Sequence, residues 1–210
     1  MNIVFDLGAV LVQWRPQELL RQHFPQHAAT PALAQALADD FFHHADWARF
    51  DRGTLPMAQV IALHCARLDL PAPAVASLVQ TIGEHLQPMT DTVALLARLH
   101  ALREQDRAVR LYYLSNMPEP YARTLEQRHD FFAMFDGGVF SGDVQLAKPE
   151  PAIYSLLETR YALQPERTVF IDDLAANITV AKVRGWHGIQ FESALQVETE
   201  LNAWMASRAR

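Results

Sequence analysis

Short apolar segments that end abruptly at polar residues are the feature that most constrains the fold of this chain. Three of them are predicted to be buried strands, because each is a short run of apolar, β-branched or aromatic residues: Asn2–Phe5, Arg110–Leu114 and Thr168–Ile171. Weaker patterns of the same kind predict strands at Gly138–Phe140 and Gly188–Phe191. Segments of this length are typical of strands in a globular domain.

Patterns with a helical period separate these strands in the second half of the chain. They cover Asp91–Gln105, Pro118–His129, Pro149–Tyr161 and Leu174–Arg184. Two of them open with proline, which suits the first turn of a helix, and Gly185 follows the last, where glycine commonly ends a helix. Strands that alternate with helices after about residue 88 predict an α/β fold with a parallel sheet covered on both faces.

Residues 16–87 show helical patterns and no convincing strand. The helical segments are Pro16–Phe24, Pro31–Phe42, Pro56–Leu68 and Pro73–His85. An all-helical segment inserted after the first strand is expected to form a separate unit. We therefore predict a core of residues 1–15 and 88–210 and a helical cap of residues 16–87.

Length, charge and cysteine content exclude several classes of protein. A chain of 210 residues is expected to form one domain, or one domain that carries a smaller inserted one. Its net charge of -6 argues against nonspecific nucleic-acid binding, which requires a basic surface. The single cysteine, Cys65, cannot form an internal disulfide. The apolar start reaches Asp6 too soon for a signal peptide to be expected, and the sequence shows no uncharged apolar run of membrane-spanning length. We expect a cytoplasmic protein with no membrane partner; the oligomeric state stays open.

Polar residues follow the strong strands at the points where the strands end. Asp6 follows the first, Ser115 and Asn116 follow the second, and Asp172 and Asp173 follow the third. A further element, Ala147–Pro151, carries Lys148 just before a predicted helix. Because ligands of parallel sheets bind beyond the carboxyl ends of the strands, these side chains are expected to converge on one rim.

This set of side chains suits phosphoryl transfer. Asp6 is ionised at neutral pH and can attack phosphorus, provided that the charge of the phosphate is neutralised. Mg²⁺ takes oxygen ligands from carboxylates such as Asp6, Asp172 and Asp173 and leaves room for phosphate oxygens. Lys148 is a compact positive charge for the remaining oxygens, and Ser115 can donate a hydrogen bond. Only two of the 18 basic residues are lysines, which makes a lysine at this position informative; Lys182, the other, is expected on a solvated face.

The order of these segments resembles the four motifs of the haloacid dehalogenase superfamily. The matching segments are Val4–Leu11, Leu114–Asn116, Lys148–Pro149 and Phe170–Asp173, and the helical insert resembles a C1-type cap. The resemblance implies a Rossmann-like core, a cap that closes over a small phosphorylated substrate, and an aspartyl phosphate formed on Asp6. It also implies that Lys148 acts in catalysis and that Ser115 and Asn116 bind the phosphate. The magnesium ligands that it implies are Asp6, the backbone carbonyl of Gly8, Asp172 and Asp173.

The chain departs from most phosphatases of this superfamily at Gly8, where they carry a second aspartate that acts as general acid and base. General acid catalysis typically contributes about 10²–10⁴-fold to the rate. The leaving group could need little protonation, another group or a water could carry the proton, or the protein could have lost turnover. The first explanation is favoured, because Asp-Leu-Gly-Ala-Val resembles a branch that includes sugar-1-phosphate phosphatases of the α-glucose-1-phosphate type.

Two other functions stay open. A binding or regulatory protein without turnover would explain Gly8, but Asp6, Ser115, Lys148 and Asp172 are all retained. A 2-haloacid dehalogenase would not need magnesium, and the resemblance implies that such enzymes lack the paired aspartates of the last motif.

Two sequence features near these motifs have simpler explanations. The nine histidines show no zinc-binding spacing and are expected to be solvated or partly buried. Trp14-Arg15 and the segment Trp47–Gly53 either pack as aromatic core residues, with Gly53 at a helix end, or place Arg15, Arg49 or Arg52 at the cap–core cleft against the substrate.

Overall fold

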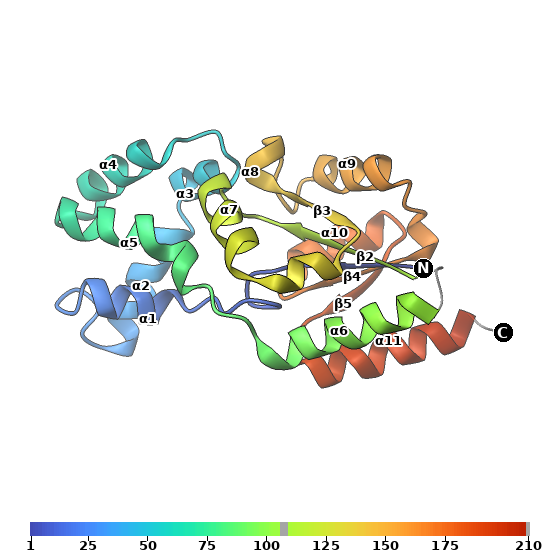
Figure 1. Ribbon diagram of the computed structural model, residues 1–210. Coiled ribbons are helices and arrows are strands. Elements are labelled where there is room, and N and C mark those ends of the chain that lie inside the picture. The colour runs from blue at the N-terminus through green and yellow to red at the C-terminus, as the bar shows by residue number, and fades with distance from the viewer. Residues whose placement is uncertain (106–108, 209–210) are drawn as a thin grey trace.

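The computed structural model describes residues 1–105 and 109–208 and contains a five-stranded parallel sheet (Figure 1). The strands are β1 Asn2–Phe5, β2 Arg110–Ser115, β3 Gly137–Phe140, β4 Thr168–Asp172 and β5 His187–Gln190. Their order in the sheet is β3-β2-β1-β4-β5, so β1 lies at the centre. Phe5 pairs with Tyr113 on one side and with Ile171 on the other, and the three central strands therefore end near one another.

Helices cover both faces of the sheet, which confirms the predicted α/β fold. In this part of the chain they are α6 Thr90–Gln105, α7 Glu119–Arg128, α8 Ser141–Val144, α9 Pro151–Tyr161, α10 Ala175–Val183 and α11 Ala194–Arg208, with short 3-10 turns at Asp130–Met134 and Pro165–Arg167. The pair α6 and α11 packs on one face, and α9 and α10 pack on the other (Figure 1). All five strands and the helices corresponding to α6, α7, α9 and α10 were predicted from the sequence.

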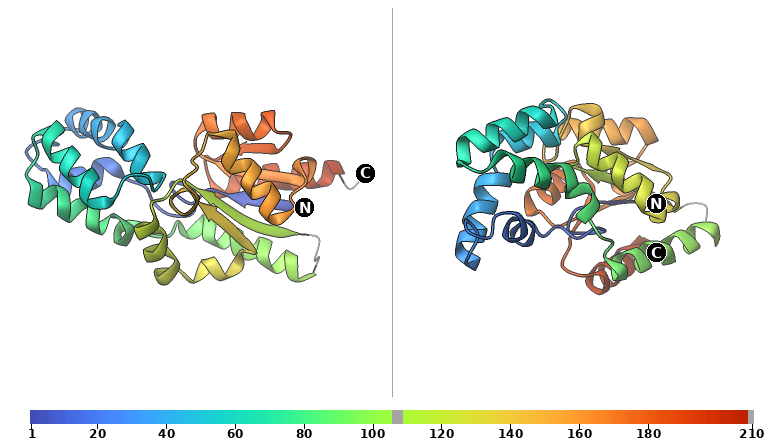
Figure 2. Two further views of the ribbon diagram at one scale, coloured as in Figure 1. Left: turned by 90° about the horizontal axis from the view of Figure 1, so that it is seen from above. Right: turned by 60° about the vertical axis from the view of Figure 1, so that its left-hand side comes forward.

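Between Pro16 and His85 the chain forms helices only. They are α1 Pro16–His23, α2 Pro31–Phe42, α3 Ala45–Asp51, α4 Met57–Leu68 and α5 Ala72–His85. Figure 2 shows these five helices gathered at one end of the molecule, whereas both chain termini lie at the opposite end. We use "cap" for α1–α5 from here on; the division into a 16–87 cap and a separate core stays a structural hypothesis.

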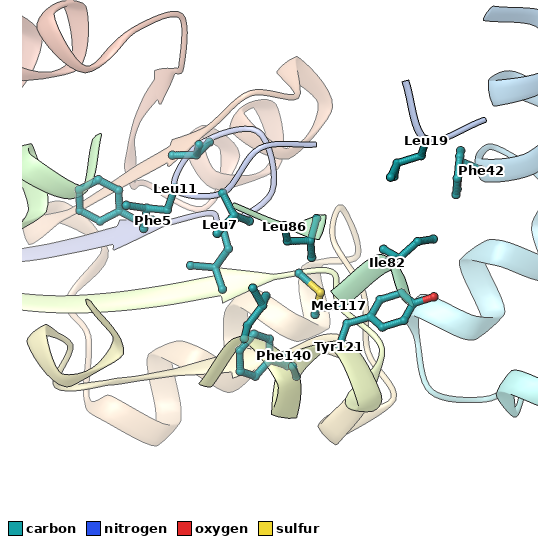
Figure 3. Close-up of a cluster of buried hydrophobic side chains, with 14 of the residues drawn as sticks. Phe5, Leu7, Leu11, Leu19, Phe42, Ile82, Leu86, Met117, Tyr121 and Phe140 are labelled. Carbon is teal, nitrogen blue, oxygen red and sulfur yellow. The ribbon is translucent and has the colours of Figure 1, made fainter. Parts of the chain in front are cut away.

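The hydrophobic core is continuous between the sheet and the cap. Phe5 and Leu11 on the sheet side, and Phe42 and Ile82 in the cap, belong to one cluster of buried side chains. Figure 3 shows Leu86, Met117 and Tyr121 lying between these two groups. Burial contributes roughly 25 cal/mol per Å² of apolar surface, so this contact holds the cap against the sheet. No helix of the described residues is long and apolar enough to cross a bilayer.

The C-terminal end of α3 contacts α8, which follows β3, and Glu150, which precedes α9. The Ser141 hydroxyl donates a hydrogen bond of 2.5 Å to the backbone carbonyl of Asp51. Arg52 forms an ion pair with Glu150. Gly53, with φ +77°, lies so close to the backbone of Gly142 that a Cβ atom at position 53 would be 2.4 Å from its carbonyl oxygen. We call residues 51–53 the α3 junction.

Gly53→Ala is expected to destabilise the protein by more than Gly185→Ala. Both glycines have positive φ, which costs an alanine about 1 kcal/mol, but a Cβ at Gly185 would meet its nearest neighbour only at 3.4 Å. At Gly53 the overlap with the Gly142 backbone adds a further cost, about 1–3 kcal/mol, and pushes the α3 junction away from the sheet. Urea unfolding of both variants measures the difference; equal losses would contradict the close backbone contact.

Candidate active site

The loop after β1 holds Asp6 at the carboxyl edge of the sheet. The backbone N–H of Asp6 donates to the carbonyl of Ile171 at 2.8 Å, which continues the sheet by one residue. The Leu7 carbonyl then accepts hydrogen bonds from the N–H groups of the loop residues Val10, Leu11 and Val12. The Leu7 N–H donates to Asp6 Oδ1 at 2.7 Å. The loop therefore fixes the orientation of one carboxylate oxygen and leaves Oδ2 without a donor among the described residues.

Lys148 lies buried between two carboxylates. Its Nζ is 2.9 Å from Asp6 Oδ1 and 2.7 Å from Asp172 Oδ2. Burial lowers the pKa of this ammonium group, but Asp172 and Asp6 outweigh burial and raise it, so Lys148 stays charged. The side chain of Asn116 holds the lysine in place, because its amide donates to the Lys148 carbonyl at 2.9 Å and its oxygen accepts from the Lys148 N–H at 2.8 Å.

Asp172 has hydrogen-bond donors at every acceptor position of its carboxylate. Oδ1 accepts from the Leu174 N–H at 2.8 Å and from the Asn177 amide at 2.9 Å. Oδ2 accepts from Lys148 at 2.7 Å and from the Asn177 amide at 3.0 Å. Two carboxylate oxygens offer about four such positions in total. Of the two adjacent aspartates, Asp172 is therefore the one that positions Lys148.

Asp6, Asp172 and Asp173 form a compact group of carboxylates that can hold a metal ion. Among the described residues they are the one such group, with an oxygen from each lying within 4.8 Å of the others. Burial raises the pKa of Asp6 to about 7, with Lys148 opposing this shift and Asp172 adding to it. Burial and the neighbouring Asp172 also raise the pKa of Asp173. Carboxylates that repel one another in this way favour a divalent cation between them, and oxygen ligands suit Mg²⁺.

Ser115 and Asn116 have different environments although they are adjacent. Ser115 is buried at the end of β2 and lines the cavity described below, and its hydroxyl has no hydrogen-bond partner among the described residues. It is therefore free to donate to a bound anion. The side chain of Asn116 is engaged with the backbone of Lys148, which leaves only its N–H group for the phosphate contact that the sequence analysis predicted.

A cavity of about 500 Å³ lies between the cap and the carboxyl edge of the sheet. The predicted site residues Asp6, Gly8, Ser115, Lys148 and Asp173 line one part of it. Large apolar side chains line another part, three from the cap (Phe42, Trp47 and Ile82) and three from segments beside it (Trp14, Leu86 and Tyr121). The polar residues Gln17, Gln35, Asp39 and His43 line it as well. The structure therefore places the predicted site residues in one cavity together with several aromatic side chains.

None of the three arginines proposed for the cleft lines this cavity. Arg15 pairs with Glu18, Arg49 with Asp46, and Arg52 with Glu150. The geometry therefore favours the other alternative for these segments, in which the aromatic residues Trp47 and Phe50 pack and no arginine reaches the cavity. The aromatic residues Trp14 and Trp47 do line the cavity, and Lys182 is exposed as predicted.

The sequence analysis missed two polar residues of the site. The side-chain amide of Asn177 on α10 donates to both carboxylate oxygens of Asp172. In the sequence, only the position of Asn177 five residues after Asp172 could have indicated this role. Asp51 ends α3 and lines the cavity from the cap side. It belongs to the Trp47–Gly53 segment, whose arginines were the residues expected near the cleft.

Comparison with known proteins gives a match over most of the chain. The family model described as "haloacid dehalogenase-like hydrolase" matches residues 3–185. Among curated proteins, the sesquiterpene phosphatase of Aspergillus oryzae is 22% identical over 198 residues, which are 94% of this chain and 93% of that protein. The drimenol cyclase of Aspergillus calidoustus is 26% identical over 99% of this chain, but the chain spans only 37% of that protein's length.

A solved structure with the same fold contains both magnesium and phosphate. It is a HAD family enzyme of Bacteroides thetaiotaomicron in complex with magnesium and inorganic phosphate, with a TM-score of 0.69 and 20% identity. The match covers 91% of this chain and 93% of that one. At this identity the likeness concerns the fold alone.

Proposed function

Because the chain belongs to the haloacid dehalogenase-like hydrolase family, we propose that it is a magnesium-dependent phosphatase that forms an aspartyl phosphate on Asp6. One observation carries the proposal: a buried carboxylate with an oxygen that accepts no hydrogen bond faces a cavity beside a buried ammonium group. A nucleophile needs such an available oxygen, and an incoming phosphate needs such a fixed positive charge. The sesquiterpene phosphatase and the magnesium- and phosphate-bound structure support this function by similarity.

Each residue of the site has a role in this reaction. Oδ2 of Asp6 attacks phosphorus, while Oδ1 stays bonded to the Leu7 N–H and Lys148. Lys148 neutralises charge on the phosphate oxygens and is positioned by Asp172 and by the side chain of Asn116. The Ser115 hydroxyl donates to a phosphate oxygen. Water then attacks the phosphorus of the aspartyl phosphate, which restores Asp6 and releases inorganic phosphate.

Magnesium fits the donor set of this site. Asp6, Asp172, Asp173 and the backbone carbonyl of Gly8 are the proposed ligands. The acceptor positions of Asp172 are taken by Lys148, Asn177 and Leu174. We therefore propose that Asp172 contributes less to binding the magnesium ion than Asp173 does. When bound, the ion neutralises phosphate charge and makes phosphorus more susceptible to attack.

Two classes of substrate are candidates. A sugar 1-phosphate is the first, because its anomeric leaving group is more acidic than an ordinary alcohol and so tolerates glycine at position 8. A phosphate ester with an apolar organic part is the second, favoured by the aromatic wall of Trp14, Phe42 and Trp47. The named activity of the sesquiterpene phosphatase agrees with the second class.

Two rival functions predict different products. A binding protein without turnover would bind phosphate with magnesium but release nothing from activated esters. A 2-haloacid dehalogenase would release halide without magnesium, and it would have no use for the group of three carboxylates around Asp173.

We expect magnesium-dependent phosphate release from at least one phosphate ester. The panel contains sugar 1-phosphates, sugar 6-phosphates, nucleotides, alkyl phosphates and p-nitrophenyl phosphate, each with Mg²⁺ and with EDTA, and 2-chloropropionate is assayed for halide. Release confined to anomeric phosphates favours the sugar class, and release that increases with alkyl chain length favours the apolar class. A folded protein that binds magnesium and hydrolyses no member of the panel would refute the proposed function.

A further inference from the structure

Asp51 is a residue of the cavity wall whose carboxyl group has no interaction partner among the described residues. It is the last residue of α3 and lines the cavity that also contains Asp6, Ser115 and Lys148. Its side chain has neither a hydrogen bond nor an ion pair with any of the described residues. Two neighbouring acidic side chains of the cap are engaged: Asp46 on the same helix pairs with His44 and Arg49, and Asp39, which also lines the cavity, bonds to Gln35 and His43.

The backbone of Asp51 is held next to the phosphate-binding segment of the core. Its carbonyl accepts from the Ser141 hydroxyl at 2.5 Å, and the same hydroxyl oxygen accepts from the Met117 N–H at 2.8 Å. Met117 lies two residues after Ser115. The neighbouring Arg52 and Gly53 are fixed on the core by the contacts of the α3 junction. The Asp51 side chain is thus presented from the cap beside the residues that would bind the phosphate.

The surroundings of Asp51 favour its protonated form. Burial raises the pKa of this carboxyl well above its usual range. Its place in the last turn of a helix adds to this effect, because the negative end of the helix dipole disfavours a carboxylate there. The other titratable groups that line the cavity are Asp6, Asp39, His43, Tyr121, Lys148 and Asp173, and Arg52 beside it is paired with Glu150.

We infer that Asp51 is the general acid and base of this enzyme and supplies from the cap the proton transfer that Gly8 cannot. This inference rests on the proposed phosphatase function. It selects the second of the three explanations for Gly8, in which another group carries the proton. A carboxylic acid whose protonated form is favoured by burial is suited to donate a proton to a leaving oxygen.

The proton balance of the two steps is complete with Asp51 alone. As the bond from Asp6 Oδ2 to phosphorus forms and the bond from phosphorus to the leaving oxygen breaks, the Asp51 carboxyl transfers its proton to that oxygen, and the organic part departs as an alcohol. The Asp51 carboxylate then takes a proton from the water that attacks the aspartyl phosphate. The bond from phosphorus to Asp6 breaks, inorganic phosphate leaves, and the Asp51 carboxyl is restored.

The test compares Asp51→Asn with wild type on two esters that differ in leaving group, p-nitrophenyl phosphate and hexyl phosphate. The quantity compared is kcat/KM, because it reports the step in which the leaving group departs. Loss of a general acid is expected to lower kcat/KM for hexyl phosphate by about 100-fold or more. For p-nitrophenyl phosphate, whose leaving group is acidic, the loss is expected to stay within about tenfold. The fall of the hexyl phosphate profile at alkaline pH is expected to disappear in the variant.

Two further variants separate catalysis from structure. Asp46→Asn makes the same chemical change on the same helix, outside the cavity wall, and is expected to act on both esters as wild type does. Gly8→Asp introduces a carboxyl at the position where the family resemblance implies one in most phosphatases, and a Cβ at position 8 would meet no atom within 4 Å. In the background of Asp51→Asn it is expected to recover at least about tenfold of the lost activity on hexyl phosphate.

Each outcome has a separate meaning. Equal losses on both esters, or no loss on hexyl phosphate, would overturn the inference while leaving the phosphatase function intact; equal losses would make Asp51 a binding residue instead. Wild type that binds Mg²⁺ and hydrolyses no member of the panel described above, hexyl phosphate included, would overturn the proposed function, and the role of Asp51 with it.

Discussion

Asp6→Asn is expected to lower turnover by roughly 10³-fold or more, which corresponds to about 4 kcal/mol of lost transition-state stabilisation. The amide that replaces the carboxylate has no negative oxygen to attack phosphorus, so no aspartyl phosphate can form. The loss should appear with every substrate, because no ester can transfer its phosphoryl group without the Asp6 carboxylate. The measurement is the rate of phosphate release with saturating Mg²⁺, together with mass spectrometry of acid-quenched protein, in which only wild type should carry a phosphoryl group.

The fold of Asp6→Asn is expected to persist. Lys148 keeps its contact of 2.7 Å with Asp172, and the raised pKa of Asp6 shows that its charged form is disfavoured in the folded protein. In EDTA the variant should therefore unfold thermally at the wild-type temperature or above it. Asp130→Asn, an exposed carboxyl that does not line the cavity, is the matched control and should keep wild-type turnover. Substantial phosphate release by Asp6→Asn would contradict the assignment of the nucleophile.

The sheet and the position of the site were predictable because both depend on local patterns. The strands are short runs of buried residues, and a parallel sheet brings the carboxyl ends of β1, β2 and β4 to the same edge whatever the rest of the chain does. Asp6, Ser115 and Asp172 therefore meet as predicted. The short helix α8 and the C-terminal helix α11 were missed: α8 has only four residues, and α11 buries just Val197, Leu201 and Trp204 among polar neighbours.

The division of roles within the site was not predictable, because it depends on which atoms face one another across separate segments. Asn116 follows β2 like a phosphate ligand, yet its side chain is directed to the backbone of Lys148, 32 residues away. Asp172 and Asp173 are adjacent in sequence but point in different directions from the end of β4, so only Asp172 contacts the lysine. Local sequence patterns carry no information on such orientations.

The cap side of the cavity was the least predictable part. The segment Trp47–Gly53 was recognised as unusual, but its arginines face solvent or Glu150, whereas Asp51 faces the cavity. Which side chain of a helix end points inward depends on how that helix packs. Here Trp47 and Phe50 are the buried side chains of α3, and its end contacts the core through the Ser141 hydroxyl and the close approach of Gly53 to Gly142.

Lys148→Met is expected to destabilise the protein by about 3–5 kcal/mol at pH 7 in EDTA, the cost of removing one partner from a buried ion pair. The methionine fills the space of the lysine stem, so the change tests the charge and not the packing. Without the ammonium group, the carboxylates of Asp6 and Asp172 remain buried with no cation between them. The pKa of Asp6, which burial already raises to about 7 against the opposing effect of Lys148, should then rise further above its value in the unfolded state. Folded protein therefore binds more protons than unfolded protein, so stability falls as pH rises and the deficit shrinks as pH is lowered to 5.

Magnesium should distinguish this electrostatic cost from a packing defect. A cation held by Asp6 and Asp173 relieves the repulsion that Lys148 no longer relieves, so Mg²⁺ should stabilise Lys148→Met more than it stabilises wild type. Turnover should not return with it, because the phosphate still lacks the ammonium group.

Lys182→Met removes the other lysine of the chain, which is exposed, and should change the free energy of unfolding by no more than about 0.5 kcal/mol. Urea unfolding at pH 5 and pH 7, with EDTA and with Mg²⁺, measures all of these quantities. A Lys148→Met variant as stable as wild type at pH 7 in EDTA would mean that Asp6 is protonated there, and its role as a nucleophile at that pH would then depend entirely on the metal.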